Sequence, residues 1–412
     1  MNGFNLLIEH QCPQCGAPAI LKETDRFFSC EFCRAKSYLI QNNFFRYMLP
    51  NNATQDKELL FFPYWRFKGT LFSCLASGVK HRFMDMSHRA AESEYFPLSV
   101  GLRSQTLKLR FASTETKGRF LKPTLPVKKV MGIFQGRFNT LLRKPVLHQA
   151  YIGETLSLIY SPFYLDKKLF DAVLNEPVSP VLPDDFDVSL FQEDQSDFSI
   201  RFLPAICPEC GWDLDSTRDS LVLFCKNCDS AWQPSTNGFK KINFARVPGL
   251  EGDDVIYMPF WRIKAKISGI DLASYADLVK IANLPVVVRK NWDKIEFYFW
   301  IPGFKIRPGE FLNLNRRITI AQPREKLAPG LPVSRLYPVT LPVKEAAESL
   351  KINLACFAKP QKIFLSKIDD INITAKKFLL VHIPFVEKHH ELIQPAFKIA
   401  INKNHLALSG NL

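Results

Sequence analysis

The chain has 412 residues, of which 47% are hydrophobic and 23% are charged. These proportions are ordinary for a folded protein and exclude a largely disordered chain, and the length suits two or three domains of roughly 100–200 residues each. The formal net charge of +14 is compatible with a nucleic acid or an anionic membrane surface as partner but requires neither. Ten cysteines are too few for a disulfide-stapled secreted scaffold of this length, so their positions decide their role.

The chain shows no sign of a targeting or membrane-spanning segment. Residues 1–10 lack the positively charged region and long apolar core of a secretory signal. The longest apolar stretches, at 59–65, 297–304 and 378–385, fall short of the ~20 residues that span a bilayer. We therefore expect a cytoplasmic protein without a transmembrane segment.

The most specific motif is a pair of matching cysteine constellations. Each has two Cys-x-x-Cys pairs separated by fourteen residues, 16–29 in the first and 211–224 in the second. This spacing lets two short turns present four thiolates tetrahedrally, as Zn²⁺ prefers. Gly16 and Gly211 stand where such a turn favours a positive φ. The predicted metal ligands are Cys12, Cys15, Cys30 and Cys33 in the first site and Cys207, Cys210, Cys225 and Cys228 in the second.

The expected ions are two Zn²⁺. Iron in a rubredoxin-like site uses the same Cys-Pro-x-Cys-Gly turn, and a redox dithiol is a third interpretation, although it usually has a single Cys-x-x-Cys pair. Because four thiolates leave no position for water or substrate, both sites should be structural rather than catalytic. The other two cysteines, Cys74 and Cys356, stand alone among apolar neighbours and are predicted to be core thiols.

Further landmarks recur in the same order behind each constellation. A Pro-aromatic-Trp-Arg motif occurs at 63–66 and 259–262, the pentapeptide Thr-Leu-Pro-Val-Lys at 124–128 and 340–344, and a Pro-Phe pair at 162–163 and 384–385. The offset between copies grows from 195 at the cysteines to 222 at the last landmark. The repeat predicts a tandem duplication, in which each copy is a rubredoxin-like zinc ribbon followed by a larger β-rich domain.

The join between the copies is visible in the composition. Residues 169–200 contain eight Asp or Glu, no Lys or Arg, and the prolines Pro177, Pro180 and Pro183, as a semi-rigid spacer would. The predicted domains are a first ribbon (1–42), a first β-rich domain (43–174), an acidic linker (175–200), a second ribbon (201–238) and a second β-rich domain (239–412).

The expected secondary structure is α+β and dominated by strands. In the strands after the Pro-aromatic-Trp motif, one face carries Trp65 or Trp261 and should be core, whereas the other is basic and is either solvated or part of an anion-binding surface. Further strands are predicted at 27–29, 106–111, 221–224, 286–288, 295–300 and 397–401. Helices are predicted within 84–91, at 275–281 and at 344–350, the last after a helix-initiating Pro342.

A basic segment covers residues 101–150, which contain eleven Lys or Arg, a single acid, Glu115, and interleaved phenylalanines. Such a segment could track phosphates while its aromatic rings stack on bases. Two alternatives are the acidic linker of the same chain and an anionic lipid surface. The residues predicted to contact an anion or a nucleic acid are Arg103, Lys108, Arg110, Lys128, Lys129, Arg143 and Lys144.

The paired Cys-Pro-x-Cys-Gly ribbons, the Pro-Phe-Trp strand at 259–261 and the late Pro-Phe strand at 384–385 resemble a bacterial group of tandem zinc-ribbon proteins. The group is labelled transcription-factor-IIB-type zinc ribbon or primosomal-helicase-like. The resemblance implies metal binding and assembly. Some members carry transmembrane segments and resemble partners of membrane scaffolds, which for this chain implies at most a peripheral membrane role.

Motifs for catalysis are missing from the sequence. There is no GxxxxGK[ST] phosphate loop, which argues against a helicase, and no HExxH, GxSxG or GxGxxG motif. The sequence therefore predicts a non-enzymatic zinc-binding protein that acts as an interaction or assembly module for other proteins. The alternative is a nucleic-acid-binding protein that uses the basic segment.

Overall fold

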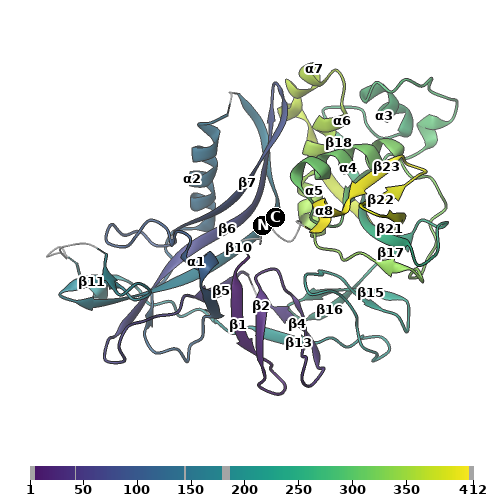
Figure 1. The fold of residues 1–412 in the computed structure, drawn as a ribbon. Coiled ribbons are helices and arrows are strands. Elements are labelled where there is room, and N and C mark those ends of the chain that lie inside the picture. Colours follow the sequence, from purple (N-terminus) through teal and green to yellow (C-terminus); the bar gives the residue numbers. More distant parts are fainter. Residues whose placement is uncertain (1–4, 42, 143–144, 179–185, 408–412) are drawn as a thin grey trace. The chain divides into compact units, whose positions relative to one another are not determined.

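The computed structural model describes residues 5–41, 43–142, 145–178 and 186–407 (Figure 1). Strands account for 40% of the residues and helices for 18%, which confirms the predicted β-dominated α+β class. Two compact units are present. Unit 1 consists of Met1–Lys68, Met84–Leu141 and Thr155–Pro204, and unit 2 of Gly69–Phe83, Leu142–Glu154 and Ala205–Leu412.

Unit 1 is organised around a sheet with the strand order β12-β11-β10-β5-β8-β1-β2, to which β6 adds by pairing with β10, β7 and β9. A separate small sheet has the order β13-β4-β3. The strands are β1 (Leu7–Gln11), β2 (Pro18–Lys22), β3 (Phe27–Ser29), β4 (Lys36–Ile40), β5 (Phe45–Met48), β6 (Leu59–Leu75), β7 (Gly78–Arg89), β8 (Lys108–Phe111), β9 (Arg119–Phe120), β10 (Val146–Asp166), β11 (Lys168–Asp171), β12 (Glu176–Pro177) and β13 (Arg201–Pro204). The end of β6, the start of β7 and the start of β10 belong to unit 2. The helices are α1 (Arg103–Thr106), α2 (Val127–Asn139) and the short 3-10 helix η1 (Val188–Leu190).

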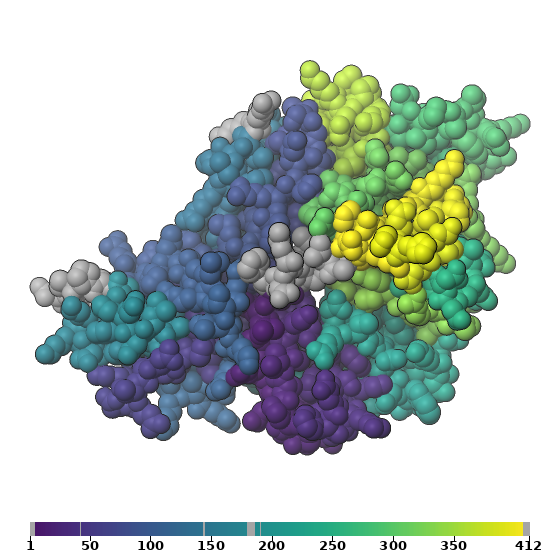
Figure 2. Space-filling model, in the orientation of Figure 1, coloured from purple at the N-terminus to yellow at the C-terminus, as the bar shows by residue number. Residues whose placement is uncertain are grey.

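Unit 2 contains a sheet with the order β19-β18-β21-β22-β23, with β17 added to β21 and β20 to β18, and a small sheet β14-β15-β16. Strands β22 and β23 and helix α8, yellow in Figure 2, lie on the face of unit 2 shown there. The strands are β14 (Leu223–Cys225), β15 (Ser230–Ser235), β16 (Gly238–Ile242), β17 (Phe244–Arg246), β18 (Val255–Ser268), β19 (Phe299–Pro302), β20 (Arg335–Leu336), β21 (Asn372–Lys388), β22 (Glu391–Gln394) and β23 (Ile399–Asn402). The helices are α3 (Tyr275–Ile281), η2 (Trp292–Lys294), α4 (Pro308–Ala321), α5 (Val343–Glu348), α6 (Leu350–Phe357), α7 (Gln361–Leu365), η3 (Ile368–Asp370) and α8 (Lys403–Ala407).

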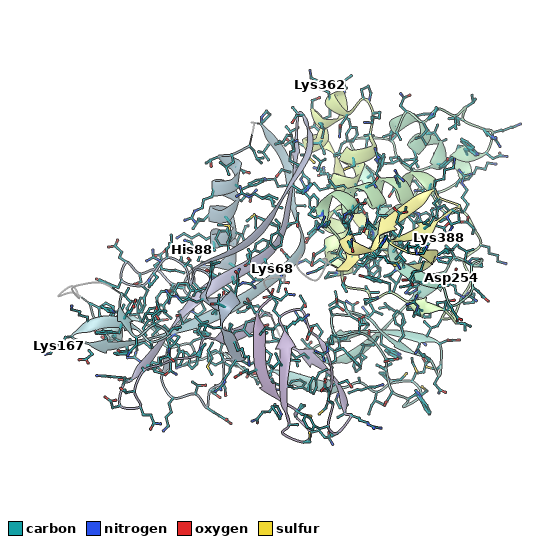
Figure 3. The ribbon with its side chains drawn as sticks, in the orientation of Figure 1. Lys68, His88, Lys167, Asp254, Lys362 and Lys388 are labelled. Carbon is teal, nitrogen blue, oxygen red and sulfur yellow. The ribbon has the colours of Figure 1, made fainter. Side chains whose placement is uncertain are left out.

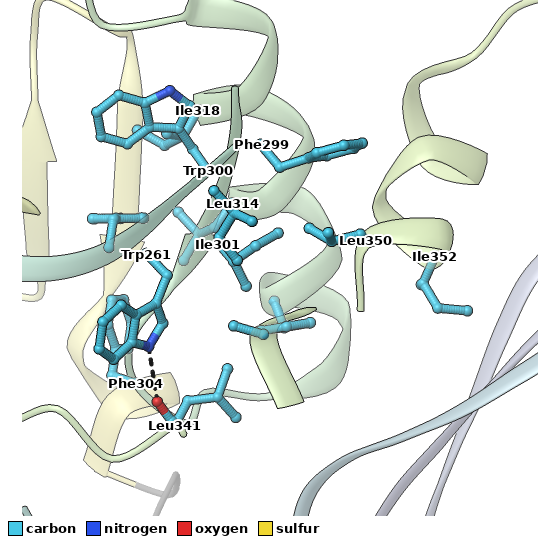
Figure 4. Close-up of a cluster of buried hydrophobic side chains, with 14 of the residues drawn as sticks. Trp261, Phe299, Trp300, Ile301, Phe304, Leu314, Ile318, Leu341, Leu350 and Ile352 are labelled. Carbon is cyan, nitrogen blue, oxygen red and sulfur yellow. Dashed lines mark hydrogen bonds between the residues drawn. The ribbon is translucent and has the colours of Figure 1, made fainter. Parts of the chain in front are cut away.

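The core of unit 2 forms where α4 and α6 pack over the strands β18 and β19 (Figure 4). Its largest members are Trp261 and Trp300, which are almost completely buried together with Phe299 and Ile301. The indole Nε1 of Trp261 donates a hydrogen bond to the Leu341 carbonyl oxygen at 3.0 Å, so the buried polar group of the ring has a partner. The predicted core face of this strand is therefore correct.

The same hydrogen bond occurs inside unit 1, between Trp65 Nε1 and the Leu125 carbonyl at 2.8 Å. In both units the accepting leucine belongs to the repeated Thr-Leu-Pro-Val-Lys pentapeptide, and the helix after it begins at the valine, α2 in unit 1 and α5 in unit 2. The helix-initiating role of Pro342 is thus confirmed, with Pro342 as the N-cap residue.

The internal pairings of the two units also correspond. In unit 1, β5 runs parallel to β10 and β9 runs parallel to the start of β6. In unit 2, β17 runs parallel to β21 and β20 runs parallel to the start of β18. Each unit therefore contains two long paired strands, β6 and β10 or β18 and β21, each with a short parallel strand beside it.

The basic face of the first Pro-aromatic-Trp strand is neither solvated nor open to anions, so both predicted alternatives are wrong for this copy. Arg66 and Lys68 are buried and pair with the buried carboxylate of Glu23; Lys68 is labelled in Figure 3. Arg66 also contacts Asp85 at 2.9 Å. A buried charge without a partner destabilises the fold. The basic side chains on this face of the strand can therefore be buried only because carboxylates pair with them.

The equivalent face in unit 2 is different. The guanidinium of Arg262 lies 4.0 Å from the centre of the Tyr298 ring, and Lys264 pairs with Glu296 at 3.2 Å. Both basic side chains are half-buried. The repeated motif therefore determines the strand and its tryptophan face, whereas the neighbouring elements determine what the basic face does.

Several predicted elements are confirmed and others are wrong. Helix α3 has the predicted bounds 275–281, and α5 and α6 cover the predicted helix at 344–350. The helix predicted within 84–91 is instead the end of β7, because pairing with β6 overrides the local preference. The strand predicted at 286–288 is an irregular exposed segment.

The two longest of the described helices, α2 and α4, are among those not predicted from the sequence. In α2 the buried residues Val130, Phe134 and Phe138 recur every four positions, which is a helical period. Lysine and arginine occupy several of the other positions of the helix, so the apolar face of α2 is narrow.

Removal of the indole hydrogen bond should destabilise each unit separately. Trp261→Phe keeps an aromatic ring but leaves the buried Leu341 carbonyl without its donor, at a cost of about 2 kcal/mol. Trp65→Phe should cost a similar amount through Leu125. Urea unfolding measures both, and Trp212→Phe is the control because its indole is 62% exposed. Equal stability of all three variants would contradict the assigned role.

The buried His382 should make unit 2 acid-sensitive. It is fully buried against Phe224 and Phe244, and this burial lowers the pKa of its imidazole to about 4, from about 6.5 in an unfolded chain. Between these values the unfolded chain binds more protons, so the free energy of unfolding falls as the pH decreases, by about 2 kcal/mol at pH 5.

Urea unfolding at pH 7 and pH 5 tests this. His382→Phe should lose this part of the pH dependence, whereas His389→Gln, on an exposed turn, should retain it. A pH dependence identical in wild type and His382→Phe would refute the prediction.

Candidate metal centres

The first predicted centre is assembled at the ends of two hairpins in unit 1. Cys12 and Cys15 lie in the turn between β1 and β2, and Cys30 and Cys33 in the turn between β3 and β4. Across the centre, Sγ of Cys12 is 3.8 Å from Sγ of Cys33, and Sγ of Cys15 is 3.7 Å from Sγ of Cys30. The four cysteines predicted from spacing therefore meet.

The second centre has the same arrangement in unit 2. Sγ of Cys207 is 3.6 Å from Sγ of Cys228, and Sγ of Cys210 is 3.4 Å from Sγ of Cys225. In both centres the first cysteine of each Cys-x-x-Cys pair is buried, whereas the second is more exposed. Each centre thus lies at the edge of its unit, with two ligands fixed by packing.

Backbone hydrogen bonds shape the turns that carry the ligands. The Gly16 N–H donates to the Cys12 carbonyl and the Gly211 N–H to the Cys207 carbonyl, each at 2.9 Å. Both glycines have the predicted positive φ, 72° and 74°. In the other turns the corresponding residues are Arg34 and Asp229, with φ of 60° and 51°, so a non-glycine residue accepts the left-handed conformation there.

The donor set fits a tetrahedral metal ion. A metal–sulfur distance of about 2.3 Å in a tetrahedron places the sulfurs about 3.8 Å apart, close to the observed separations. The ligand atoms of each group lie within 4.8 Å of one another, and no other group of three or more His, Cys, Asp or Glu in the described part of the chain could hold a metal ion. All ten cysteines are free thiols, so no disulfide competes for the ligands.

The turns also favour deprotonated sulfur. The backbone N–H of Cys33, directed at the Cys30 sulfur, lowers the pKa of the Cys30 thiol to about 6. The side chain of Asn227 does the same for Cys210, whose pKa is also lowered to about 6. Burial and the neighbouring sulfurs raise the pKa of Cys33 and Cys228 in the same centres. Since the thiolate is the form that binds metal, each centre has at least one thiol that deprotonates readily and others that a cation would have to deprotonate.

The surroundings of the second centre include a hydroxyl that sequence spacing did not identify. Ser230 Oγ lies 3.0 Å from Cys228 Sγ and accepts a hydrogen bond from Trp232 Nε1 at 2.7 Å. In the first centre the corresponding position is Ala35. The position of Ser230, two residues after the last ligand, is the signal that could have indicated it.

The small sheets that carry the centres differ between the units. In unit 1 the third strand beside β4 is β13, formed by residues 201–204, which the sequence assigned to the start of the second ribbon. In unit 2, β14, β15 and β16 follow one another along the chain and form a meander. The acidic linker therefore ends in a strand of unit 1.

The predicted anion-binding residues do not form one continuous strand or helix. They are distributed over α1, β8 and α2, and several of their charges are paired. Lys108 and Arg110 both contact Glu9, at 3.5 and 3.4 Å, and Lys129 contacts Glu92 at 2.9 Å. Lys128 is exposed on α2. Arg143 and Lys144 lie outside the described residues.

Two ion pairs join the basic segment to the acidic residues of 169–200. Arg103 pairs with the carboxylate of Asp171, and Arg119 Nε lies 2.7 Å from Glu193 Oε1. Both pairs lie within unit 1. The acidic residues of the same chain, one of the three predicted partners, therefore already pair with part of the basic segment.

The lone cysteines are not part of the centres. Cys74 is completely buried in the core of unit 2, as predicted, whereas Cys356 on α6 is only partly buried.

Comparisons with known protein families, with curated proteins and with solved structures found no match. In the described residues, none of the helices combines the length and apolar character needed to cross a membrane.

Loss of one ligand should empty only its own centre. Cys12→Ser should reduce the metal content from two ions to one per chain and unfold the strands around the first centre, since metal binding and folding are coupled by as much as ~10 kcal/mol. Cys207→Ser should do the same in unit 2. Elemental analysis and chelator-induced changes in circular dichroism measure both.

Cys356→Ser is the matched control and should retain two ions. Wild-type protein with fewer than two ions per chain at neutral pH would contradict the assignment. Acidification should release the metal from wild type, because protons compete for the thiolates.

Proposed function

We propose that this protein is a non-catalytic zinc protein whose two metal centres hold together an interaction module for other proteins. The observation that carries the proposal is the pair of four-sulfur groups at tetrahedral spacing. A centre with four thiolates has a closed coordination shell, so its ion stabilises the fold and offers no position to a substrate. The residues that would hold the ions are the eight cysteines of the two groups.

Zinc is the ion that the donor set favours. It prefers tetrahedral thiolate coordination and undergoes no redox change, which suits a site that maintains structure. Iron would use the same ligands in the same geometry. Absorption spectroscopy of the purified protein separates the two, because a ferric tetrathiolate centre is coloured and a zinc centre is not.

A tandem duplication accounts for the matched features of the two units. Supporting observations are the equivalent Trp65–Leu125 and Trp261–Leu341 hydrogen bonds and the equivalent parallel strands β9 and β20. Another is the pair of metal centres at an offset of 195 residues. After a duplication, the two copies can keep the same internal hydrogen bonds while their exposed faces diverge. Such divergence would let one copy bind partners while the other does not.

The role in assembly is supported by the way the chain uses its charges. The largest basic segment is partly neutralised inside unit 1 through Arg103 and Arg119, which reduces its availability to a polyanion. The nucleic-acid alternative stays a prediction. It requires an affinity whose logarithm falls linearly with the logarithm of salt concentration, with a smaller slope after charge reversal at Lys128 and Lys129.

Affinity purification from the native cell after nuclease treatment tests the assembly role. We expect defined proteins to co-purify with wild type and with Cys356→Ser, and to be lost from Cys207→Ser if the second centre maintains the binding surface. Recovery of the chain alone in every preparation would refute the proposal. Partners that disappear with nuclease would favour the nucleic-acid alternative.

A further inference from the structure

The outer edge of β9 in unit 1 is covered by a segment of the same chain, residues 191–194, called here the covering segment. The Asp194 N–H donates to the Phe120 carbonyl at 2.7 Å, and the Lys122 N–H donates to the Gln192 carbonyl at 2.8 Å. Leu121 and Glu193 form the antiparallel bridge between these bonds. The covering segment thus acts as an added strand.

Strand β20 of unit 2 occupies the equivalent position. Arg119 of β9 pairs with Leu60, and Arg335 of β20 pairs with Ile256. The next inward hydrogen bonds also agree, from the Leu121 N–H to the Phe61 carbonyl at 3.0 Å and from the Tyr337 N–H to the Tyr257 carbonyl at 2.9 Å. Leu336 therefore corresponds to Phe120, whose carbonyl accepts from the covering segment.

The outer edge of β20 has no such cover. Among the described strands, β20 pairs only with β18. Beside it lies a groove of about 840 Å³, with residues 331–338 on one wall and Asp215, Ser216, Thr217 and Phe224 on the other. Phe120 and Leu121 are buried under the covering segment, whereas Leu336 and Tyr337 are only half-buried.

The backbone of β20 offers hydrogen-bonding groups to this groove. N–H and C=O groups of successive strand residues point to opposite sides, and Tyr337 uses its N–H toward β18, so the N–H and C=O of Leu336 point outward. Exposed strand edges of this kind are templates for an added strand. Pro338 stands where unit 1 has Lys122 and lacks an N–H, so pairing centres on Leu336.

We propose that the groove beside β20 binds an extended segment of a partner protein, which pairs with Leu336 as an antiparallel strand. This inference deepens the proposed assembly function and rests on it. The segment carries an apolar residue followed by acids, like Phe191, Glu193 and Asp194 of the covering segment. The groove offers this segment the apolar side chains of Phe224, Ile256 and Leu331. Its cation Lys226 pairs with Asp215 of the same lining at 3.2 Å, so the charge that meets the acids of the segment is that of Arg335.

Arg335 provides the matching charge at the edge of the strand. In unit 1, Arg119 pairs with Glu193 of the covering segment. Arg335 stands at the same register, its side chain is 60% exposed, and one of its nitrogens pairs with Glu387. An acidic residue at the position of Glu193 would therefore meet a guanidinium that is still accessible.

The probe is a fluorescent peptide with the sequence of residues 188–199, because this is the sequence that covers the equivalent edge. Its binding to the full-length, metal-loaded protein is followed by fluorescence anisotropy. We expect saturable binding that weakens about tenfold when the amide of the residue equivalent to Asp194 is methylated, since one hydrogen bond is lost. Methylation at the residue equivalent to Glu193, whose N–H points away from the edge, is the matched control.

Variants of the protein locate the binding. Leu336→Pro removes the outward N–H and should weaken binding, whereas Val287→Asp, at an exposed residue outside the groove, should leave it unchanged. The circular dichroism and metal content of both variants should match those of wild type. If Leu336→Pro fails to fold, Leu331→Asp, which changes only the apolar wall, takes its place.

Three results would overturn the inference. The first is no saturation up to about 1 mM peptide, and the second is binding that ignores both the methylated amide and the groove variants. The third is binding that appears only after deletion of residues 408–412, because the chain itself would then occupy the groove. None of these results depends on capture of a native partner, so failure here is distinguishable from failure of the assembly proposal.

Discussion

The antiparallel pairing of β18 with β21 is the constraint on which the rest of unit 2 depends. The ladder runs from Val255 opposite Val386 to Ser268 opposite Asn372, with one register shift after Lys264. Every other strand of that sheet is placed by it, since β19 and β20 add to β18, and β17 and β22 add to β21. A slip of one residue would turn Trp261 out of the core and bring charged side chains in, so the hydrophobic pattern and the ladder enforce each other. In unit 1, β6 and β10 also pair with each other, and β9 and β5 add to them.

The long strand pairs position the two candidate metal centres, but they do not by themselves stabilise the short strands around each centre. The strands around each centre are short, and a segment of this size buries too little apolar surface to fold alone. Each group of four sulfurs could hold one metal ion, whose bonds would replace the missing core. The short strands β5 and β17 then join each metal-held sheet to a long pair. Because each cysteine group and the long strand pair that follows it in the chain depend on each other, the two occur together in both units.

The differences between the two units are as informative as their matching features. Arg66 and Lys68 are buried with Glu23 in unit 1, whereas their counterparts Arg262 and Lys264 lie half-buried beside Tyr298. The edge of β9 is covered by the chain itself, and the equivalent edge of β20 borders a groove. The strand edge is thus covered in unit 1 and borders a groove in unit 2, which is the basis for proposing that a partner binds unit 2.

The sequence by itself determined which eight cysteines meet in two four-sulfur groups, the order of the repeated landmarks and the tryptophan face of the central strands, because each depends on local spacing. Two Cys-x-x-Cys pairs specify a four-thiolate site wherever they meet, and a strand shows its faces with period two. Only the tertiary structure decided that the basic face of β6 is buried, that residues 84–89 form a strand and that the basic segment is divided among several elements. Each of these outcomes depends on residues distant in the chain. Glu23, which neutralises Arg66, lies 43 residues away, and Glu193, which pairs with Arg119, lies 74 residues away. No local sequence pattern indicates ion pairs between residues so far apart in the chain.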